Sequence, residues 1–138
     1  MSEGLATVAQ ANNPSDGLIE VAKLYYERCD FGVAIEKFKE AAEQFYAERD
    51  FENYLNCQNY LLRMYAERED VESIRVAKER IQDLVLKEGF ELTAKTHHTL
   101  GLCAAYKGQY DIALDYFQKS LSIALAADNK EDICRAIN

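Results

Sequence analysis

The chain has 138 residues, the usual length of one domain, and 49% of them are hydrophobic, which excludes an intrinsically disordered protein. It carries 24 acidic and 16 basic residues, a net charge of −8, which argues against broad binding to nucleic acid or to anionic membranes. No apolar run approaches the ~18 residues that a membrane span needs.

Apolar residues recur at helical spacing along almost the whole sequence, and only one proline and six glycines interrupt them. Residues 1–13 are expected to form a flexible leader or a short helix, and Pro14 begins the first amphipathic stripe. That stripe consists of Leu18, Val21, Ala22 and Tyr25. Further helical stripes follow over 31–45, 55–65, 74–85, 92–104 and 112–124. The start of another helix, either a further or a capping one, is expected over 130–138.

These helices repeat in pairs. Tyr25 and Tyr65 are 40 residues apart, and Phe31, Val71 and Tyr110 follow one another at steps of 40 and 39. One helix–turn–helix unit is therefore predicted three times within a domain over 15–133, at about 15–54, 55–93 and 94–133.

The third unit carries the clearest motif, with Leu100-Gly101 in its first helix and Ala113 and Phe117 four residues apart in its second. This pattern resembles the tetratricopeptide repeat. The first unit fits it as well, whereas the second has Lys78 where the others have Phe. The family's first-helix Trp is replaced in every unit, and the step of 39–40 residues resembles an extended variety of the repeat.

The resemblance implies an all-α fold, a right-handed superhelix or α-solenoid of about three helix pairs plus a terminal helix. Small residues in the paired helices let the backbones approach, and aromatic side chains fill the gap to the next repeat. Because a solenoid normally ends in a polar capping helix, the thin terminal stretch with Ile133 and Ile137 suggests the N-terminal region of a larger protein. The alternatives are that this stretch is a short natural cap, or that self-association covers the open face.

No constellation of residues suggests catalysis. His97 and His98 are adjacent, so on a helix they point in different directions, and no acidic residue lies three or four positions from either. We therefore expect no enzyme, no metal site and no cofactor, and His97 is predicted to be a satisfied core imidazole. The cysteines are widely spaced, which predicts reduced thiols packed mostly as small hydrophobic residues. They are Cys29, Cys57, Cys103 and Cys134.

In tetratricopeptide domains the first helices line a concave groove that commonly holds a peptide or a partner helix. The resemblance places ten positions of this chain in such a groove. They are Ile19, Lys23, Tyr26, Asn59, Arg63, Ala66, Lys95, His98, Leu102 and Ala105. Three basic groups and an Asn favour an acidic or carboxylate-bearing ligand, although surface Lys and Arg are often only solvated. The family's chaperone-tail clamp is rejected, because only Lys95 matches its pattern.

The predicted function is a non-catalytic protein–protein interaction module that binds a partner peptide or helix. Met1 to Gly4 show no basic region before a hydrophobic stretch, so a cytoplasmic protein is expected, without nucleic-acid or membrane partners. The alternatives are a small stand-alone chaperone or adaptor, similar to secretion chaperones, and an oligomerisation scaffold. A regulatory arm of an enzyme whose catalytic domain lies elsewhere also stays open.

Overall fold

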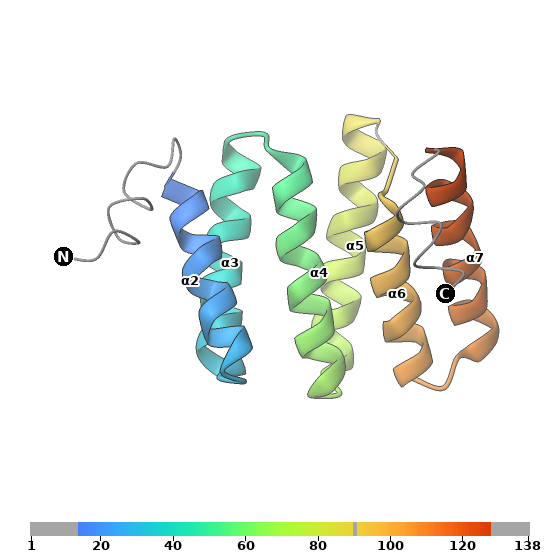
Figure 1. Cartoon of the computed structure of the whole chain (residues 1–138), viewed down its shortest axis with the longest axis horizontal. Coiled ribbons are helices and arrows are strands. Elements are labelled where there is room, and N and C mark those ends of the chain that lie inside the picture. The colour runs from blue at the N-terminus through green and yellow to red at the C-terminus, as the bar shows by residue number, and fades with distance from the viewer. Residues whose placement is uncertain (1–13, 90, 128–138) are drawn as a thin grey trace. The chain divides into compact units, whose positions relative to one another are not determined.

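A computed structural model describes residues 14–89 and 91–127, and every regular element within these ranges is an α-helix. The predicted leader over 1–13 and the predicted helix over 130–138 lie outside the described residues. Figure 1 labels the six helices. They are α2 Pro14–Glu27, α3 Phe31–Ala47, α4 Phe51–Glu67, α5 Val71–Glu88, α6 Ala94–Tyr106 and α7 Tyr110–Ala126.

The four turns α2–α3, α3–α4, α4–α5 and α6–α7 share one geometry. In each turn a residue with positive φ follows the helix, and the next residue donates its backbone N–H to a carbonyl five residues back. These bonds are Asp30 to Tyr25, Asp50 to Phe45, Asp70 to Tyr65 and Gln109 to Ala104, all at 2.9 Å. The residues with positive φ are Cys29, Arg49, Glu69 and Gly108. Each turn therefore closes one helix with the Schellman pattern and places the next helix start at the following residue.

Aspartate at the start of the next helix explains where α4 begins. The side chain of Asp50 accepts the backbone N–H of Asn53 at 3.3 Å and the side-chain amide of Asn53 at 2.8 Å. An N-terminal cap of this kind satisfies a backbone donor that has no partner within the helix. The helix consequently begins at Phe51, four residues before Leu55, where the second repeat was expected to begin.

The chain divides into two compact units, one up to Met64 and one from Tyr65, so the boundary falls within α4. In the first unit, α2 and α3 pack as an antiparallel pair (Figure 1). Small residues bring these helices together, because Ala22 of α2 and Ala34 of α3 are fully buried. Phe38 and Phe45 of α3 are also fully buried and form the centre of this core.

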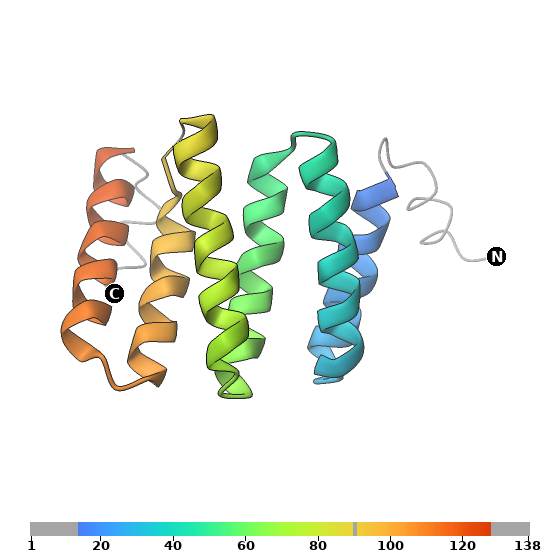
Figure 2. The same ribbon diagram turned by 180° about the vertical axis from the view of Figure 1, so that it is seen from behind.

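In the second unit, α6 and α7 form a corresponding antiparallel pair (Figure 2). A Cβ atom placed on Gly101 would lie 2.6 Å from Cε1 of Phe117, so only glycine allows this approach. The hydroxyl of Ser120 donates to the carbonyl of Ala94 at 2.8 Å and fixes α7 against the first residue of α6. The packing that the repeat motif predicts for its third unit is confirmed at these positions.

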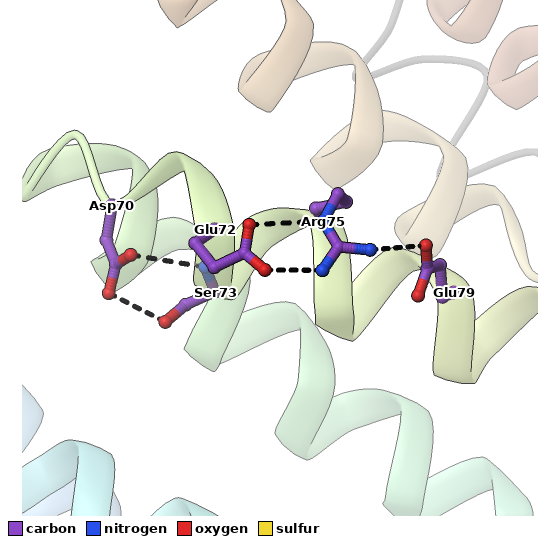
Figure 3. A network of polar contacts seen from close by, with 5 residues as sticks. All are labelled: Asp70, Glu72, Ser73, Arg75 and Glu79. Carbon is purple, nitrogen blue, oxygen red and sulfur yellow. Dashed lines mark hydrogen bonds and ion pairs between the residues drawn. The ribbon is translucent and has the colours of Figure 1, made fainter.

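α5 has a polar cap at its N-terminus and glycine after its last turn. Asp70 accepts the backbone N–H of Ser73 at 3.1 Å and the hydroxyl of Ser73 at 2.7 Å (Figure 3). Gly89 follows the helix with φ 71° and donates its backbone N–H to the carbonyl of Val85, a position after a helix end that favours glycine. Among the helices described, none has the length and apolar character to cross a membrane.

Candidate functional site

Five of the predicted groove residues belong to the first unit, three on α2 and two on α4, whereas Ala66 of α4 belongs to the second unit. Ile19 and Asn59 are 40 residues apart, as are Lys23 and Arg63, so each pair occupies one repeat position on its helix. The ammonium group of Lys23 is close enough to lower the pKa of Cys57 of α4, although burial outweighs this effect. The two helices therefore lie close together at Lys23 and Cys57, as they do at Tyr26 and Tyr60.

Lys23 and Ile19 differ in how much of them a ligand can reach. Ile19 is 8% exposed, so it belongs to the core rather than to an open surface. The side chain of Lys23 is 38% exposed, and its ammonium group lies 3.7 Å from the carboxylate of Glu20 on the same helix. Such an exposed ion pair is weak, so Lys23 can exchange its partner at little cost.

Tyr26 is held in an aromatic cluster. Its ring stacks on Phe31 at 5.6 Å and meets Tyr60 edge-on at 5.1 Å, measured between ring centres. Tyr60 in turn stacks on the buried Phe38 at 4.6 Å. Offset and edge-on aromatic pairs are favourable beyond the area they bury, so these contacts fix the orientation of Tyr26. Tyr60 is not among the predicted groove positions, although an aromatic residue three positions before Arg63 was visible in the sequence.

Asn59 and Arg63 are the least satisfied polar side chains of this unit. Asn59 is 1% exposed, and neither its amide nitrogen nor its amide oxygen has a hydrogen-bond partner in the structure. One turn further along α4, Nε of the half-buried Arg63 is also buried without a partner. Buried polar groups are almost always hydrogen-bonded, and leaving one unpaired costs about 1–3 kcal/mol. With 1% exposure Asn59 is more deeply buried than Ile19, so its amide does not lie on an open surface.

The remaining predicted residues lie on α6 in the second unit. Lys95 and His98 are exposed and Leu102 is half-buried, and their spacing places them along one side of the helix. The ring of His98 lies 5.2 Å from that of Phe117. The side chain of His98 is thus positioned by the second helix of its own repeat.

The prediction for His97 is wrong in one respect. The imidazole packs beside Tyr116 as a core-type residue, with ring centres 6.2 Å apart. However, Nδ1 is buried and has no hydrogen-bond partner, so the ring is not satisfied. Its neighbours offer ammonium groups rather than acceptors. Burial, and secondarily Lys119, hold the pKa of His97 below its ordinary value.

The thiols show no sign of activation. Cys57 and Cys103 are buried, as predicted for packed cysteines, whereas Cys29 is exposed in the α2–α3 turn. Burial is the main cause that raises the pKa of the Cys57 thiol to about 12. A nucleophilic cysteine needs the thiolate form, so Cys57 is chemically inert at neutral pH. Within residues 14–89 and 91–127, no group of three or more His, Cys, Asp or Glu side chains could hold a metal ion.

A polar network on α5 is structural. Arg75 binds the carboxylate of Glu72 through two nitrogens and that of Glu79 at 2.6 Å (Figure 3). The hydrogen bond from Arg75 is the main cause that lowers the pKa of Glu72. All three side chains are more than half exposed and pair only within one helix, so the network supports α5 and forms no site.

The comparisons with known proteins agree with this geometry in one part of the chain. Residues 94–125, which contain α6 and nearly all of α7, match the family model described as tetratricopeptide repeat. No curated protein and no solved structure shows significant similarity to the chain. Together with the helices described above, the match confirms an all-α helical repeat fold.

Proposed function

Because residues 94–125 of this chain are a tetratricopeptide repeat, we propose that the protein is a non-catalytic module that binds a partner protein. Tetratricopeptide repeats generally mediate protein–protein interaction. The partner would be a peptide segment or helix that lies along the first helices of the repeats. The residues proposed to contact it are Ile19, Lys23, Tyr26, Asn59 and Arg63 in the first unit, and Lys95, His98 and Leu102 in the second.

The observation that carries this proposal is the match of residues 94–125 to the tetratricopeptide repeat. The unsatisfied amide of Asn59 adds to it, because a side-chain amide offers one acceptor and two donors, and a peptide group of a partner offers the matching donor and acceptor. Forming these bonds would remove the cost of leaving the buried amide unpaired. Since Asn59 is 1% exposed, a partner gains these bonds only where neighbouring side chains move aside to admit its peptide group.

Charge supports an acidic partner. Arg63 makes no ion pair with any described residue, and Lys23 makes only the weak pair with Glu20. A carboxylate bound by Arg63 would satisfy the guanidinium through charge-assisted hydrogen bonds, which are stronger than neutral ones. On a protein of net charge −8, basic groups at these positions would select acidic segments from neutral ones. We propose a cytoplasmic partner on the sequence grounds given above.

A selection from displayed random peptides tests the proposal. We expect the peptides that bind the parent protein to be enriched in Asp and Glu. The double variant Lys23→Glu and Arg63→Glu should weaken the best peptide at least about tenfold, because each change replaces an attraction by a repulsion. The matched control is Lys37→Glu with Lys39→Glu, a double charge reversal of the same size on α3.

The Asn59 contact needs a variant of its own. Asn59→Leu removes both amide atoms at nearly the same volume, so the domain should fold at least as well while peptide binding falls. If the charge-reversed protein binds as the parent does, or if the α3 control loses as much, the proposed surface is wrong. Failure to select any peptide with a folded protein would contradict peptide binding itself.

A second candidate function, an oligomerisation scaffold, is favoured by α7. Four large apolar side chains of this helix fall within about 60° of arc at 100° per residue. Tyr110 is 72% exposed, Leu114 56%, Leu121 44% and Leu125 50%. If a second copy covers this stripe, sedimentation should give a dimer that Leu114→Lys with Leu121→Lys dissociates. A monomer at all concentrations would remove this candidate and leave the peptide-binding proposal untouched.

A further inference from the structure

A cluster of two lysines and a histidine lies around the ring of Tyr116 in the second unit. It draws on three helices. Lys78 comes from α5, His97 from α6, and Lys119 from α7. None of these residues belongs to the groove positions, so the cluster has no part in the proposed function.

Lys78 stands where the other repeats place an aromatic residue. Phe38, Lys78 and Phe117 follow one another at steps of 40 and 39. Lys78 is half-buried and makes no ion pair with any described residue. On its own helix, the neighbours at three and four positions are uncharged or basic. They are Ile74, Arg75, Ile81 and Gln82. A half-buried lysine that has no counter-ion in the described residues would be stabilised by binding an anion from outside the chain.

The side chains of Lys78, Lys119 and His97 all lie near the ring of Tyr116. The ammonium of Lys78 lies 6.0 Å from the ring centre and that of Lys119 lies 5.8 Å from it. The centre of the His97 ring is 6.2 Å away. Ammonium groups are attracted to the electron-rich face of an aromatic ring, so each lysine gains a favourable contact with Tyr116. Tyr116 therefore acts as the platform of the cluster.

The cluster has an excess of donors over acceptors. Asp115 is the one carboxylate that pairs with a member within the described ranges, at 3.3 Å from the ammonium of Lys119. Nδ1 of His97 is buried without a partner. The lysine ammonium is a mobile point charge and binds phosphate well. A planar carboxylate is matched best by arginine, whose guanidinium group can donate two parallel hydrogen bonds to it. Donors that come from three helices also suit a tetrahedral group with several oxygens.

We propose that Lys78, Lys119 and His97 form a binding site for a phosphate group on the platform of Tyr116. The group is either free phosphate or the phosphoryl group of a small phosphorylated molecule or side chain, which share the same oxygens. The site lies on the second helices of the repeats and on the buried edge of α6. It would let the protein respond to a phosphorylated ligand without occupying the proposed partner surface.

Histidine NMR tests the site directly, because the chain has two histidines and the second serves as an internal control. The pKa of His97 is measured in sodium phosphate and in sodium chloride at a matched ionic strength of about 0.1 M, where bulk screening is equal. A bound phosphate favours the protonated ring, so we expect the pKa of His97 to rise by about 0.5 or more while that of His98 changes little. The two signals are assigned with His98→Gln.

The variant Lys78→Met keeps the apolar stem over the ring and removes the charge. It should weaken phosphate binding about five- to tenfold, whereas Lys39→Met on the exposed side of α3 should bind as the parent does. Lys119→Met is the second variant, should the first lower the melting temperature. O-phosphoserine distinguishes the sources: binding equal to that of inorganic phosphate assigns the phosphoryl group, and weaker binding assigns the free ion.

Three results would overturn the site. The pKa of His97 would be the same in phosphate and chloride, or the two histidines would shift equally, or Lys78→Met would bind as tightly as the parent. An equal effect of acetate at the same concentration would overturn the choice of phosphate. None of these outcomes affects the proposed partner surface, since the charge reversals at Lys23 and Arg63 test α2 and α4 separately.

Discussion

Gly101 of α6 and Phe117 of α7 lie in direct contact, and the helices approach so closely that a Cβ on the glycine would lie 2.6 Å from the phenyl ring. His98, three residues before Gly101 on α6, also lies beside this ring, with ring centres 5.2 Å apart. One glycine and one phenylalanine thus set the distance between α6 and α7, the helix pair that matches the tetratricopeptide repeat. The relationship can be tested from both sides.

Gly101→Ala should lower the free energy of unfolding by about 1–2 kcal/mol. Overpacking costs typically about 1–3 kcal/mol, and the better helix propensity of alanine returns up to about 1 kcal/mol. Urea unfolding measures the difference, and Gly32→Ala at an exposed position of α3 is the matched control, neutral or stabilising. In the background of Phe117→Ala the same change should no longer destabilise; an unchanged loss there would show that the ring is not the obstacle.

Phe38→Ala should cost about 3–5 kcal/mol of unfolding free energy, because the side chain is fully buried and stacks on Tyr60. Tyr110→Ala, at a ring that is 72% exposed, should cost less than about 0.5 kcal/mol. Thermal and urea unfolding followed by circular dichroism compare the two. A Phe38→Ala protein that melts with the parent would contradict the packing of the first unit.

Glu69→Gly should stabilise the protein by about 0.5–1 kcal/mol. Glu69 has φ 55°, a conformation that costs an L residue about 1–2 kcal/mol and that glycine adopts freely. Replacing Glu69 by glycine therefore relieves this strain. Part of the gain in stability is lost because glycine is more flexible in the unfolded chain. Gly108 has φ 77° in the corresponding turn, and a Cβ there would meet no atom within 4 Å.

Replacing Gly108 by alanine is the opposite substitution, and it tests backbone strain without any steric clash. Gly108→Ala should destabilise by about 1 kcal/mol without any clash, and Glu69→Ala should leave stability nearly unchanged. At an unchanged slope of the unfolding transition, the urea midpoint of each of the three variants gives its change in stability. If Glu69→Gly were destabilising, the side chain rather than the backbone would determine that turn.

Stability should fall as the pH is lowered through the titration range of His97. The folded pKa lies below the ordinary value of about 6.5, mainly through burial and then through Lys119, so the unfolded chain binds a proton more readily. The resulting stabilisation is complete above pH 6.5 and is lost as the pH falls to the lower folded pKa. His97→Gln should flatten this dependence in urea unfolding between pH 7 and 5.

Lys119→Gln provides a finer check on the cause. It should raise the pKa of His97 toward its ordinary value but not restore it, because burial is the larger cause. Complete restoration would mean that charge rather than burial depresses the pKa. An unchanged value would place Lys119 too far away to act.

The sequence could predict which residues occupy the candidate surface, but not how exposed their side chains are. The repeat register identifies Ile19, Asn59 and Arg63 as first-helix positions, and the structure places them on α2 and α4 as expected. Register alone does not reveal that Ile19 is 8% exposed, or that both amide atoms of Asn59 are buried without partners. Burial depends on side chains from several helices, which no spacing along one helix encodes.

The sequence by itself determined the helices and their pairing, because apolar periodicity and turn chemistry are local properties of the chain. The turns at Cys29, Glu69 and Gly108 lie in the gaps between the predicted helical stripes, since each backbone turn is set by a few neighbouring residues. Only the tertiary structure decided which polar groups are buried away from water without a hydrogen-bond partner in the protein. Nδ1 of His97 and the cationic cluster around Tyr116 arise where three helices meet, and their electrostatics follow from distances that the sequence order does not fix.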